Sequence, residues 1–375
     1  GLMVLIVACS KKEIITPASK EIIHFDEYHG QKVSDPYRWL ENFTDDEVKE
    51  WVGLQNNYSQ QFLKNRFQKS IKQDLELIWT SEYLSTPFKV GEKIFYYFNT
   101  GKLEQNRLMI RDCESCPERI LIDPNDFSND GTVSLASVSV SPNAEWIAFA
   151  KSDGGSDWRT WKIMNIASGE ILDDEIEWSK FSSAEWSPDS KGFFYRKYLK
   201  PDGEELLDLN SSPKLMFHSI GTDQINDQII IWDKNDPLLS RSIKVSDDGQ
   251  YKILFTEKGT DERNLISISR YDDEEFISII DEFIASYTFI DSDDSYLWFL
   301  TDHMAPNGKV VRLDFDNISL GFEEVISETT SSIRSVDFIN QSFVINYLDN
   351  TFSNIKYFSK DGNEIGSLKL DSLGS

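Results

Sequence analysis

The stretch SPDSKGFFY, residues 187–195, decides the fold of this chain. In it a polar turn precedes a short aromatic run of a kind that favours strands, and the same unit recurs along the sequence. The six turns centre on positions 91, 143, 189, 249, 294 and 341, which gives spacings of 52, 46, 60, 45 and 47 residues. A repeat of about 40 to 50 residues with several strands per unit is typical of a β-propeller blade. The sequence therefore predicts a mainly β fold with about six propeller blades over residues 81–375. Four of the turns share a preceding serine: Ser141, Ser187, Ser246 and Ser292.

The composition excludes some classes of partner. The chain has 375 residues, with 38 Lys and Arg against 64 Asp and Glu, and a formal net charge of −26. Such a chain repels phosphate backbones, so we expect no nucleic-acid partner. Solubility is the simplest interpretation of the acidic surface. Three cysteines do not make a disulfide framework.

The first nine residues are typical of a targeting segment. Leu2 to Cys9 is an apolar run that is too short to span a bilayer, and the end of it, Ile6-Val7-Ala8-Cys9, resembles a bacterial lipobox. This resemblance implies that Cys9 is lipidated and that the protein is an exported lipoprotein, anchored to a membrane on its periplasmic side. No basic region precedes the run. The alternative is a buried strand that carries a free cysteine.

The next part of the chain is predicted to be helical. Residues 10–21 are a polar linker, and residues 22–80 form an N-terminal helical segment. Thr44 and Glu47 have the spacing of a capping box, in which each side chain bonds the other residue's backbone N–H. Apolar residues then recur at helical spacing to Ile78, so residues 44–80 are expected to form two helices or one bent helix.

Eight short motifs occur in order along the chain: D-P-Y-R-W-L-E at 35–41, F-N-T-G at 98–101, Q-N-R at 105–107, L-I-D-P-N at 121–125, D-G-T-V-S-L at 130–135, G-S-D-W at 155–158, K-F-S at 180–182 and H-S-I-G-T-D-Q at 218–224. This series resembles the prolyl oligopeptidase family of serine peptidases, from about Ile22 to the end of the sequence. The related oligopeptidase B group shares the first motif, but the motifs at 121–135 resemble prolyl oligopeptidase proper.

The resemblance implies an architecture and a reaction. In that family a seven-bladed propeller covers an α/β-hydrolase domain, the N-terminal segment packs on that domain, and the Ser, Asp and His of the triad follow the propeller. A nucleophile elbow needs Gly-x-Ser-x-Gly, and no such run occurs here; the nearest, at 154–158, fails at its last position. We therefore expect no catalytic residue in this chain and no peptidase activity from it alone. The four histidines are expected to be surface or packing residues: His24, His29, His218 and His303.

Binding residues are expected on the propeller. Phe181 matches a propeller aromatic that helps wall the substrate pocket, and a pocket for a proline ring needs flat apolar surface. The alternative is a Phe of the blade core. Asp157 and Arg263 are expected to be polar pocket-side residues, and Thr260 falls where some relatives carry a cysteine. The expected partners are short proline-containing peptides, the hydrolase domain in cis and a membrane; no cofactor or metal is expected.

Cys113 and Cys116 form an isolated Cys-x-x-Cys between two apolar runs. Without a second pair or a nearby histidine this is a poor zinc site, and no thioredoxin-like pattern surrounds it. The pair is expected in a hairpin loop, where a local disulfide would suit an exported protein.

Three functions were compared on this basis. The favoured one is the N-terminal and propeller part of a serine endopeptidase that cleaves short peptides after proline, in which the propeller limits substrate access. The alternative is a stand-alone, non-catalytic propeller lipoprotein that binds or scaffolds. A sialidase-like propeller is disfavoured, because the turn at 141–146 lacks the glycine of an Asp box and the turn at 246–249 lacks its later tryptophan.

Overall fold

A computed structural model describes residues 16–64, 66–201, 211–293, 296–370 and 374. The predicted lipidation site, Cys9, and the targeting segment 1–9 lie outside these residues. The chain divides into two compact units, one that ends at Glu82 and one that begins at Tyr83. Each unit is described by itself.

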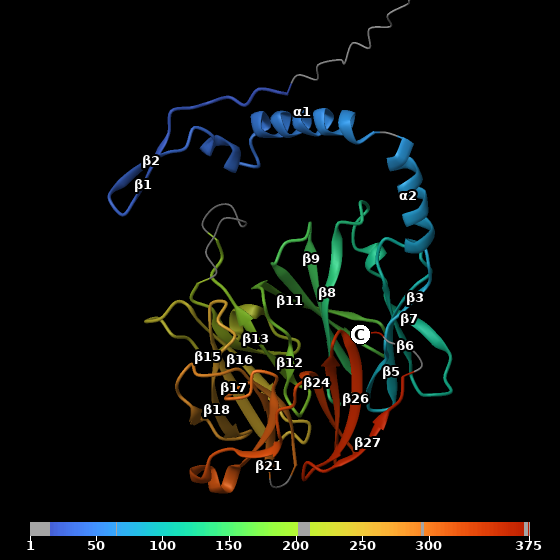
Figure 1. The fold of residues 1–375 in the computed structure, drawn as a ribbon, viewed down its shortest axis with the longest axis vertical. Helices are drawn as coiled ribbons and strands as arrows, with labels where there is room; N and C mark the ends of the chain where they lie inside the picture. The colour runs from blue at the N-terminus through green and yellow to red at the C-terminus, as the bar shows by residue number, and fades with distance from the viewer. Residues whose placement is uncertain (1–15, 65, 202–210, 294–295, 371–373, 375) are drawn as a thin grey trace, which may run out of the picture. The chain divides into compact units, whose positions relative to one another are not determined.

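The first unit contains a small hairpin and two helices (Figure 1). The hairpin pairs β1 (Phe25–Tyr28) with β2 (Gln31–Ser34), and a 3-10 turn, η1 (Arg38–Glu41), follows. The helices are α1 (Asp46–Leu63) and α2 (Arg66–Trp79), which confirms the predicted N-terminal helical segment. Within the described residues, none of the helices is long and apolar enough to cross a bilayer.

The predicted capping box is wrong by one position. Asp45, and not Thr44, is the N-cap of α1, and its carboxylate accepts a hydrogen bond from the Glu47 N–H at 2.8 Å. Thr44 donates from both its N–H and its hydroxyl to Oδ1 of Asn42, and the Glu47 carboxylate pairs with Lys20. An aspartate at the N-cap also suits the positive end of the helix dipole, so it competes well with the threonine beside it.

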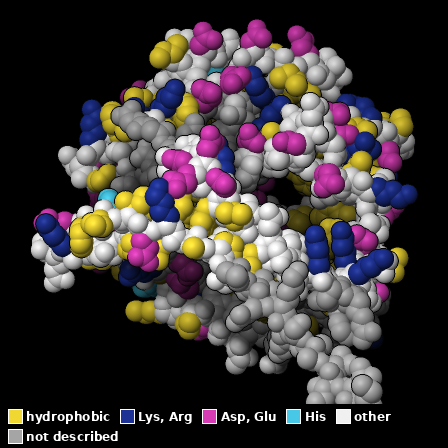
Figure 2. Space-filling model, turned by 90° about the horizontal axis from the view of Figure 1, so that it is seen from above, with side chains coloured by type: hydrophobic (Ala, Val, Ile, Leu, Met, Phe, Trp, Pro, Cys, Tyr) yellow, Lys and Arg dark blue, Asp and Glu magenta, His cyan; other side chains and the backbone are white. Residues whose placement is uncertain are grey.

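The helix α2 exposes large apolar side chains. Ile71, Leu75, Ile78 and Trp79 are 57%, 53%, 71% and 84% exposed, and Ile71, Leu75 and Trp79 line an open groove on their own helix. Figure 2 shows hydrophobic side chains interspersed with acidic and basic ones on the face seen from above. Exposed apolar side chains at this density are unusual on a solvated helix, because such surface is normally buried.

Among the residues described, the second unit consists of six antiparallel sheets that follow one another around a common axis (Figure 1), so the predicted six-blade β-propeller is confirmed. Five sheets have four strands in sequence order and the first has five, because both β3 and β4 pair with β5. The first sheet contains β3 (Tyr83–Leu84), β4 (Phe88–Val90), β5 (Lys93–Asn99), β6 (Arg107–Arg111) and β7 (Glu118–Ile122), and the second contains β8 (Val133–Val140), β9 (Trp146–Asp153), β10 (Arg159–Asn165) and β11 (Ile171–Ser179). The third contains β12 (Glu185–Trp186), β13 (Gly192–Lys197), β14 (Lys214–Ser219) and β15 (Gln228–Ile231), and the fourth contains β16 (Leu239–Val245), β17 (Tyr251–Lys258), β18 (Asn264–Arg270) and β19 (Ile277–Ile280). The fifth contains β20 (Tyr287–Ser292), β21 (Tyr296–Thr301), β22 (Lys309–Asp314) and β23 (Glu323–Ile326), and the sixth contains β24 (Ser332–Ile339), β25 (Ser342–Asp349), β26 (Phe352–Ser359) and β27 (Glu364–Leu368). Three short 3-10 turns connect them: η2 (Pro124–Asp126), η3 (Gln224–Asn226) and η4 (Phe315–Leu320).

The repeated serine has a structural role in the turns. Ser187 donates to Oδ1 of Asp189 at 2.7 Å and accepts from the Gly192 N–H at 3.2 Å, so one hydroxyl joins the two ends of the turn. Ser141 and Ser246 make the same pair of bonds in their own turns. In these three blades the serine therefore fixes the turn between the first two strands, whereas the buried hydroxyl of Ser292 has no hydrogen-bond partner among the residues that the structure describes.

The core lies between successive sheets. Trp161 of the second sheet packs with Phe193 of the third, and both are fully buried. Apolar clusters of the same kind join the first sheet to the second, the third to the fourth, the fourth to the fifth and the fifth to the sixth. Since each of these inner sheets is covered on both faces, its middle strands are continuous apolar runs and do not alternate.

Candidate functional site

The candidate site is centred on Phe181, in the connection between β11 and β12. Its side chain is 47% exposed, so it is not a residue of the blade core. Its φ of +50° is uncommon for a residue that is not glycine. An exposed aromatic side chain on an unfavourable backbone is a feature that the surrounding structure must hold in place.

Two arginines hold this connection. Arg196 of β13 donates from Nη1 to the carbonyl oxygen of Phe181 at 3.1 Å, and its backbone N–H donates to the hydroxyl of Ser182 at 2.8 Å. Arg159 of β10 donates to the carbonyl oxygen of Ser182 at 2.7 Å. The backbone around Phe181 is therefore fixed from two blades.

Arg196, which belongs to the third blade, also bonds two residues of the fourth blade. Its Nη2 lies 2.9 Å from Oε2 of Glu257 on β17, and its Nε donates to the carbonyl oxygen of Arg241 on β16. The Arg196 side chain is 8% exposed and that of Glu257 is 41% exposed. The guanidinium is thus desolvated, but all three of its nitrogen atoms have acceptors, which offsets the cost of its burial.

Lys180 is buried, whereas its neighbour Phe181 is exposed. The lysine is 4% exposed, and its Nζ lies 3.8 Å from the ring centre of Trp158 and 5.2 Å from that of Tyr198. Trp158 also makes edge contacts with Trp178 and Tyr198. Since cation–π contacts of this kind are favourable when desolvated, the buried lysine holds the connection in place, while Phe181 next to it remains exposed.

Phe181 lines two cavities. The smaller, of about 170 Å³, lies between β13 and β16, and the larger, of about 610 Å³, extends toward the loop after β17. Arg196 and Glu257 border both of them. The larger cavity combines an apolar wall with polar groups, as small-molecule and peptide sites do; its other lining residues are Tyr198, Pro213, Leu238, Ser240, Gly259, Thr260, Asp261, Glu262 and Asn264.

The structure separates the other predicted site residues. Thr260 lines the larger cavity, whereas Arg263 is exposed and does not line it. Arg263 instead bonds Asp261, which does, at 2.6 and 2.9 Å. These bonds and the N–H of residue 263 lower the pKa of Asp261 to about 2. Asp157 is exposed in the turn between β9 and β10 and lines neither cavity with Phe181.

His218 lies at the centre of a buried network that joins the second and third blades. Its Nδ1 is 2.7 Å from Asp227 and its Nε2 is 3.0 Å from Asp174, and the ring is fully buried. Burial opposes protonation of the ring, but hydrogen bonds to Asp227 and Asp174 and their charges outweigh it and raise the pKa of His218. Tyr195 donates to the second oxygen of Asp227, and burial followed by the charge of Asp227 raises the pKa of Tyr195.

The other three histidines have different surroundings. His24 contacts Asp26 at 3.1 Å in an exposed segment, His29 forms the turn between β1 and β2 with φ of +51°, and His303 stacks on Tyr287. No group of three or more residues that could hold a metal ion occurs within the part of the chain that the structure describes. The sequence motif at 154–158 forms the turn before β10.

Sequence reasoning missed Arg196, Glu257, Asp174 and Asp227. The signal for Arg196 was present, because this charged residue directly follows the apolar run Phe193 to Tyr195 in a strand that must be buried. Its partner Glu257 is 61 residues away. No local pattern indicates that pairing.

Comparison with known proteins identifies the fold and its family. Residues 17–375 match the family model described as prolyl oligopeptidase, N-terminal beta-propeller domain. A prolyl endopeptidase of Elizabethkingia miricola is 33% identical over 362 residues, which cover 96% of this chain and 51% of that protein. Prolyl oligopeptidase A of Amanita bisporigera is 29% identical over 399 residues, or 96% of this chain and 52% of that protein.

Solved structures agree. One from a structural and mechanistic analysis of two prolyl endopeptidases superposes with a TM-score of 0.87 and 27% identity, over 96% of this chain and 53% of that one. Prolyl oligopeptidase B of Galerina marginata, bound to a 35mer hydrolysis and macrocyclization substrate, gives a TM-score of 0.85 and 25% identity over 96% and 54%. The chain spans about half the length of the relatives that it matches. With six propeller sheets among its described residues and a family match over nearly its whole length, the chain belongs to the prolyl oligopeptidase family, in which it corresponds to the N-terminal β-propeller portion.

Proposed function

We propose that this chain is the N-terminal and propeller part of a serine endopeptidase that cleaves short peptides after proline. The relatives that match it along 96% of its length include prolyl endopeptidases and a prolyl oligopeptidase. The chemistry of such an enzyme needs a nucleophile, a base and an orienting carboxylate within hydrogen-bond reach of one another. We assign these groups to a part of the protein outside this chain.

The propeller's own contribution is a wall of the substrate site and control of access to it. The observation that carries this proposal is Phe181, which is 47% exposed on a connection that Arg196 and Arg159 hold rigidly. A fixed, exposed aromatic ring next to a cavity of about 610 Å³ is a suitable surface for an apolar peptide side chain.

The exposed apolar face of α2 supports the same proposal. Leu75, Ile78 and Trp79 are all more than half exposed, and burying such side chains against a second domain is favourable. In the proposed enzyme, the hydrolase domain covers these side chains of α2.

We extend the proposal to the cellular location. The lipobox-like residues 6–9 support lipidation at Cys9, export and attachment to a membrane on its periplasmic side. Metabolic labelling with a radioactive or clickable fatty acid tests it: the wild-type protein incorporates the label and Cys9→Ala does not. Equal labelling of both would contradict the assignment.

A peptidase assay with matched reporters tests the proposed reaction. The complete gene product is expected to cleave a Gly-Pro reporter peptide much faster than a Gly-Ala reporter, and this chain alone is expected to cleave neither. Cleavage by the chain alone would contradict our assignment of the triad to another part of the protein. Equal cleavage of both reporters by the complete product would contradict the proline preference.

A further inference from the structure

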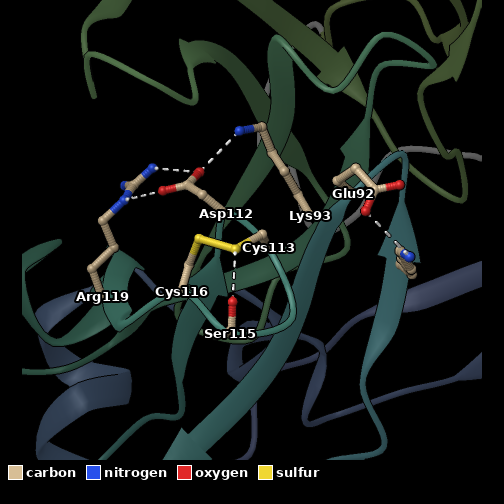
Figure 3. The surroundings of a disulfide bond; sticks show 8 residues. Glu92, Lys93, Asp112, Cys113, Ser115, Cys116 and Arg119 are labelled. Atoms are coloured by element: carbon tan, nitrogen blue, oxygen red, sulfur yellow. Dashed lines mark hydrogen bonds and ion pairs between the residues drawn. A yellow bond between two sulfur atoms is a disulfide. The ribbon is translucent and has the colours of Figure 1, made fainter.

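A disulfide closes the hairpin between β6 and β7. It joins Cys113 to Cys116 and spans two residues, Glu114 and Ser115 (Figure 3). Both cysteines are partly exposed, and the loop lies outside the apolar clusters between the blades. We propose that this pair is a site of reversible thiol–disulfide exchange, which dithiol reductants open and disulfide oxidants close while the propeller remains folded.

The hairpin does not depend on the disulfide for its geometry. The strands pair from Leu108 with Ile122 to Arg111 with Glu118, directly beside the loop. Asp112 then joins the two sides of the loop, because its Oδ2 lies 3.4 Å from Nε of Arg119 on β7 (Figure 3). Its Oδ1 lies 2.9 Å from Nζ of Lys93 and ties the loop to β5. Reduction therefore leaves the ends of the loop where they are, and the two sulfur atoms stay close enough to bond again.

The loop is also short. The N–H of Cys116 donates to the carbonyl oxygen of Cys113 at 3.1 Å, so the backbone forms a turn without help from the sulfur atoms. A cross-link over few residues removes little entropy from the unfolded chain, which is the main way in which disulfides stabilise proteins in the chain-entropy account. Reduction is thus expected to cost the propeller little stability.

The surroundings of the disulfide favour attack on one of its two sulfur atoms. The hydroxyl of Ser115 lies 3.7 Å from Sγ of Cys113, and in the reduced protein it can donate to the sulfur of that residue. Lys93 and Arg119 are both paired with Asp112, and Glu114 lies between the cysteines, so the contact with the Ser115 hydroxyl is what distinguishes the two sulfur atoms. Because stabilisation of a thiolate makes it a better leaving group, Cys113 is the sulfur that leaves and Cys116 is the one that is attacked.

The step balances with a dithiol as the reductant. The incoming thiolate bonds to Sγ of Cys116, the electron pair of the broken disulfide goes to Sγ of Cys113, and that thiolate takes a proton from solvent. The second thiol of the reductant then loses its proton and attacks the reductant's own sulfur in the mixed disulfide, and Cys116 leaves as a thiolate that also takes a proton from solvent. Two electrons and two protons have moved to the protein, and the reductant has become a disulfide.

Alkylation under native conditions tests the proposal. In a Cys9→Ser background only Cys113 and Cys116 remain. The folded protein is incubated with dithiothreitol, its free thiols are blocked with N-ethylmaleimide, and its mass is measured by mass spectrometry. Circular dichroism monitors in parallel whether the propeller stays folded. We expect two alkyl groups per chain, an unchanged spectrum, and a rate within about tenfold of that in urea.

Two results would overturn the proposal: reduction that occurs only after unfolding in urea, or loss of the propeller's spectrum together with reduction. The Ser115→Ala variant tests the direction of exchange separately. It is expected to slow reduction about threefold, since it removes the hydroxyl that stabilises the leaving thiolate. Ser115→Thr is expected to retain the rate, and the exposed Ser367→Ala on β27 serves as the control. A faster rate in Ser115→Ala would contradict the assignment of Cys113 as the leaving sulfur.

Discussion

Nδ1 of His218 lies 2.7 Å from Oδ1 of Asp227, and both side chains are fully buried. The other ring nitrogen faces Asp174, which also accepts from the Gly221 N–H, so both ring nitrogen atoms are placed to donate. A ring that donates twice is an imidazolium. The two carboxylates therefore favour the protonated ring and raise the pKa of His218, and their contacts with it join the second and third blades.

This network predicts a pH dependence of stability. The groups that face the ring are Asp174 from β11, Asp227 after η3 and, through Asp227, Tyr195 from β13. Because the pKa of His218 is raised in the folded state, its contribution is fully present below the unfolded pKa of about 6.5 and is lost as pH rises through the folded pKa. Each unit by which that pKa is raised contributes about 1.4 kcal/mol.

The measurement is urea unfolding of the wild type and of His218→Gln between pH 6 and pH 9. The variant leaves two buried carboxylates without their cation and is expected to lose about 3–5 kcal/mol at pH 6. The difference between the two proteins should shrink as pH rises. A difference that stays constant or grows with pH would show that the ring is neutral in the folded protein.

Removal of Arg196 should release the connection that carries Phe181. Arg196→Met keeps most of the apolar stem but removes the bonds to the carbonyl oxygen of Phe181 and to Glu257. We expect a loss of about 1–3 kcal/mol in the free energy of unfolding, and faster proteolysis at residues 179–183 in the native state. Arg263→Met is the control, because its guanidinium is exposed and its ion pair with Asp261 should contribute little. Equal effects of the two substitutions would contradict a specific role for Arg196.

The turn serines should stabilise their blades individually. Ser187→Ala removes a hydroxyl that is 2% exposed and bonds both Asp189 and the Gly192 N–H. The expected cost is about 1–2 kcal/mol, because a buried N–H loses its acceptor. Ser367→Ala, on an exposed position of β27, should change stability by less than about 0.5 kcal/mol. The free energy of unfolding of both variants, measured by chemical unfolding, tests this prediction. Equal values for the two would show that the Ser187 hydroxyl does not stabilise its turn.

Two glycines should respond to alanine in opposite ways. A Cβ on Gly192 would lie 2.2 Å from the carbonyl oxygen of His218 and 2.6 Å from the Phe217 ring, so Gly192→Ala must move a strand. Nothing lies within 4 Å of such an atom on Gly53, in the middle of α1. Gly53→Ala is expected to stabilise the helix by about 0.5–1 kcal/mol, whereas Gly192→Ala destabilises the propeller. Thermal unfolding would refute this if Gly192→Ala proved neutral.

The sequence was most informative where the physics is local. The turn serines, the aromatic runs after them and the two helices all follow from patterns within about ten residues, and the structure has each of them. Asp45 shows the limit even there, since the capping-box spacing predicted Thr44 as the N-cap and the neighbouring aspartate takes that position.

The site could be predicted only in part. Phe181 was identified through a resemblance, and the structure adds that its ring is exposed and that Arg196 holds its backbone. The pairs Arg196–Glu257 and His218–Asp174 connect different blades over 61 and 44 residues, so they depend on how the blades pack. Asp157 and Arg263 were predicted from their places in turns, but a side chain in a turn can point away from the site. Neither of them lines the cavities with Phe181.

The most direct test of the proposed function is the kinetics of Phe181→Ala in the complete gene product, with a Gly-Pro reporter peptide as substrate. If the exposed ring walls the substrate site, KM should rise about tenfold or more while kcat changes less, because the lost contact is one made by the bound peptide. Met304→Ala, at a side chain that is 87% exposed on another blade, should leave both constants unchanged. A Phe181→Ala enzyme with wild-type KM, or a complete product that does not cleave the Gly-Pro reporter, would contradict the proposal.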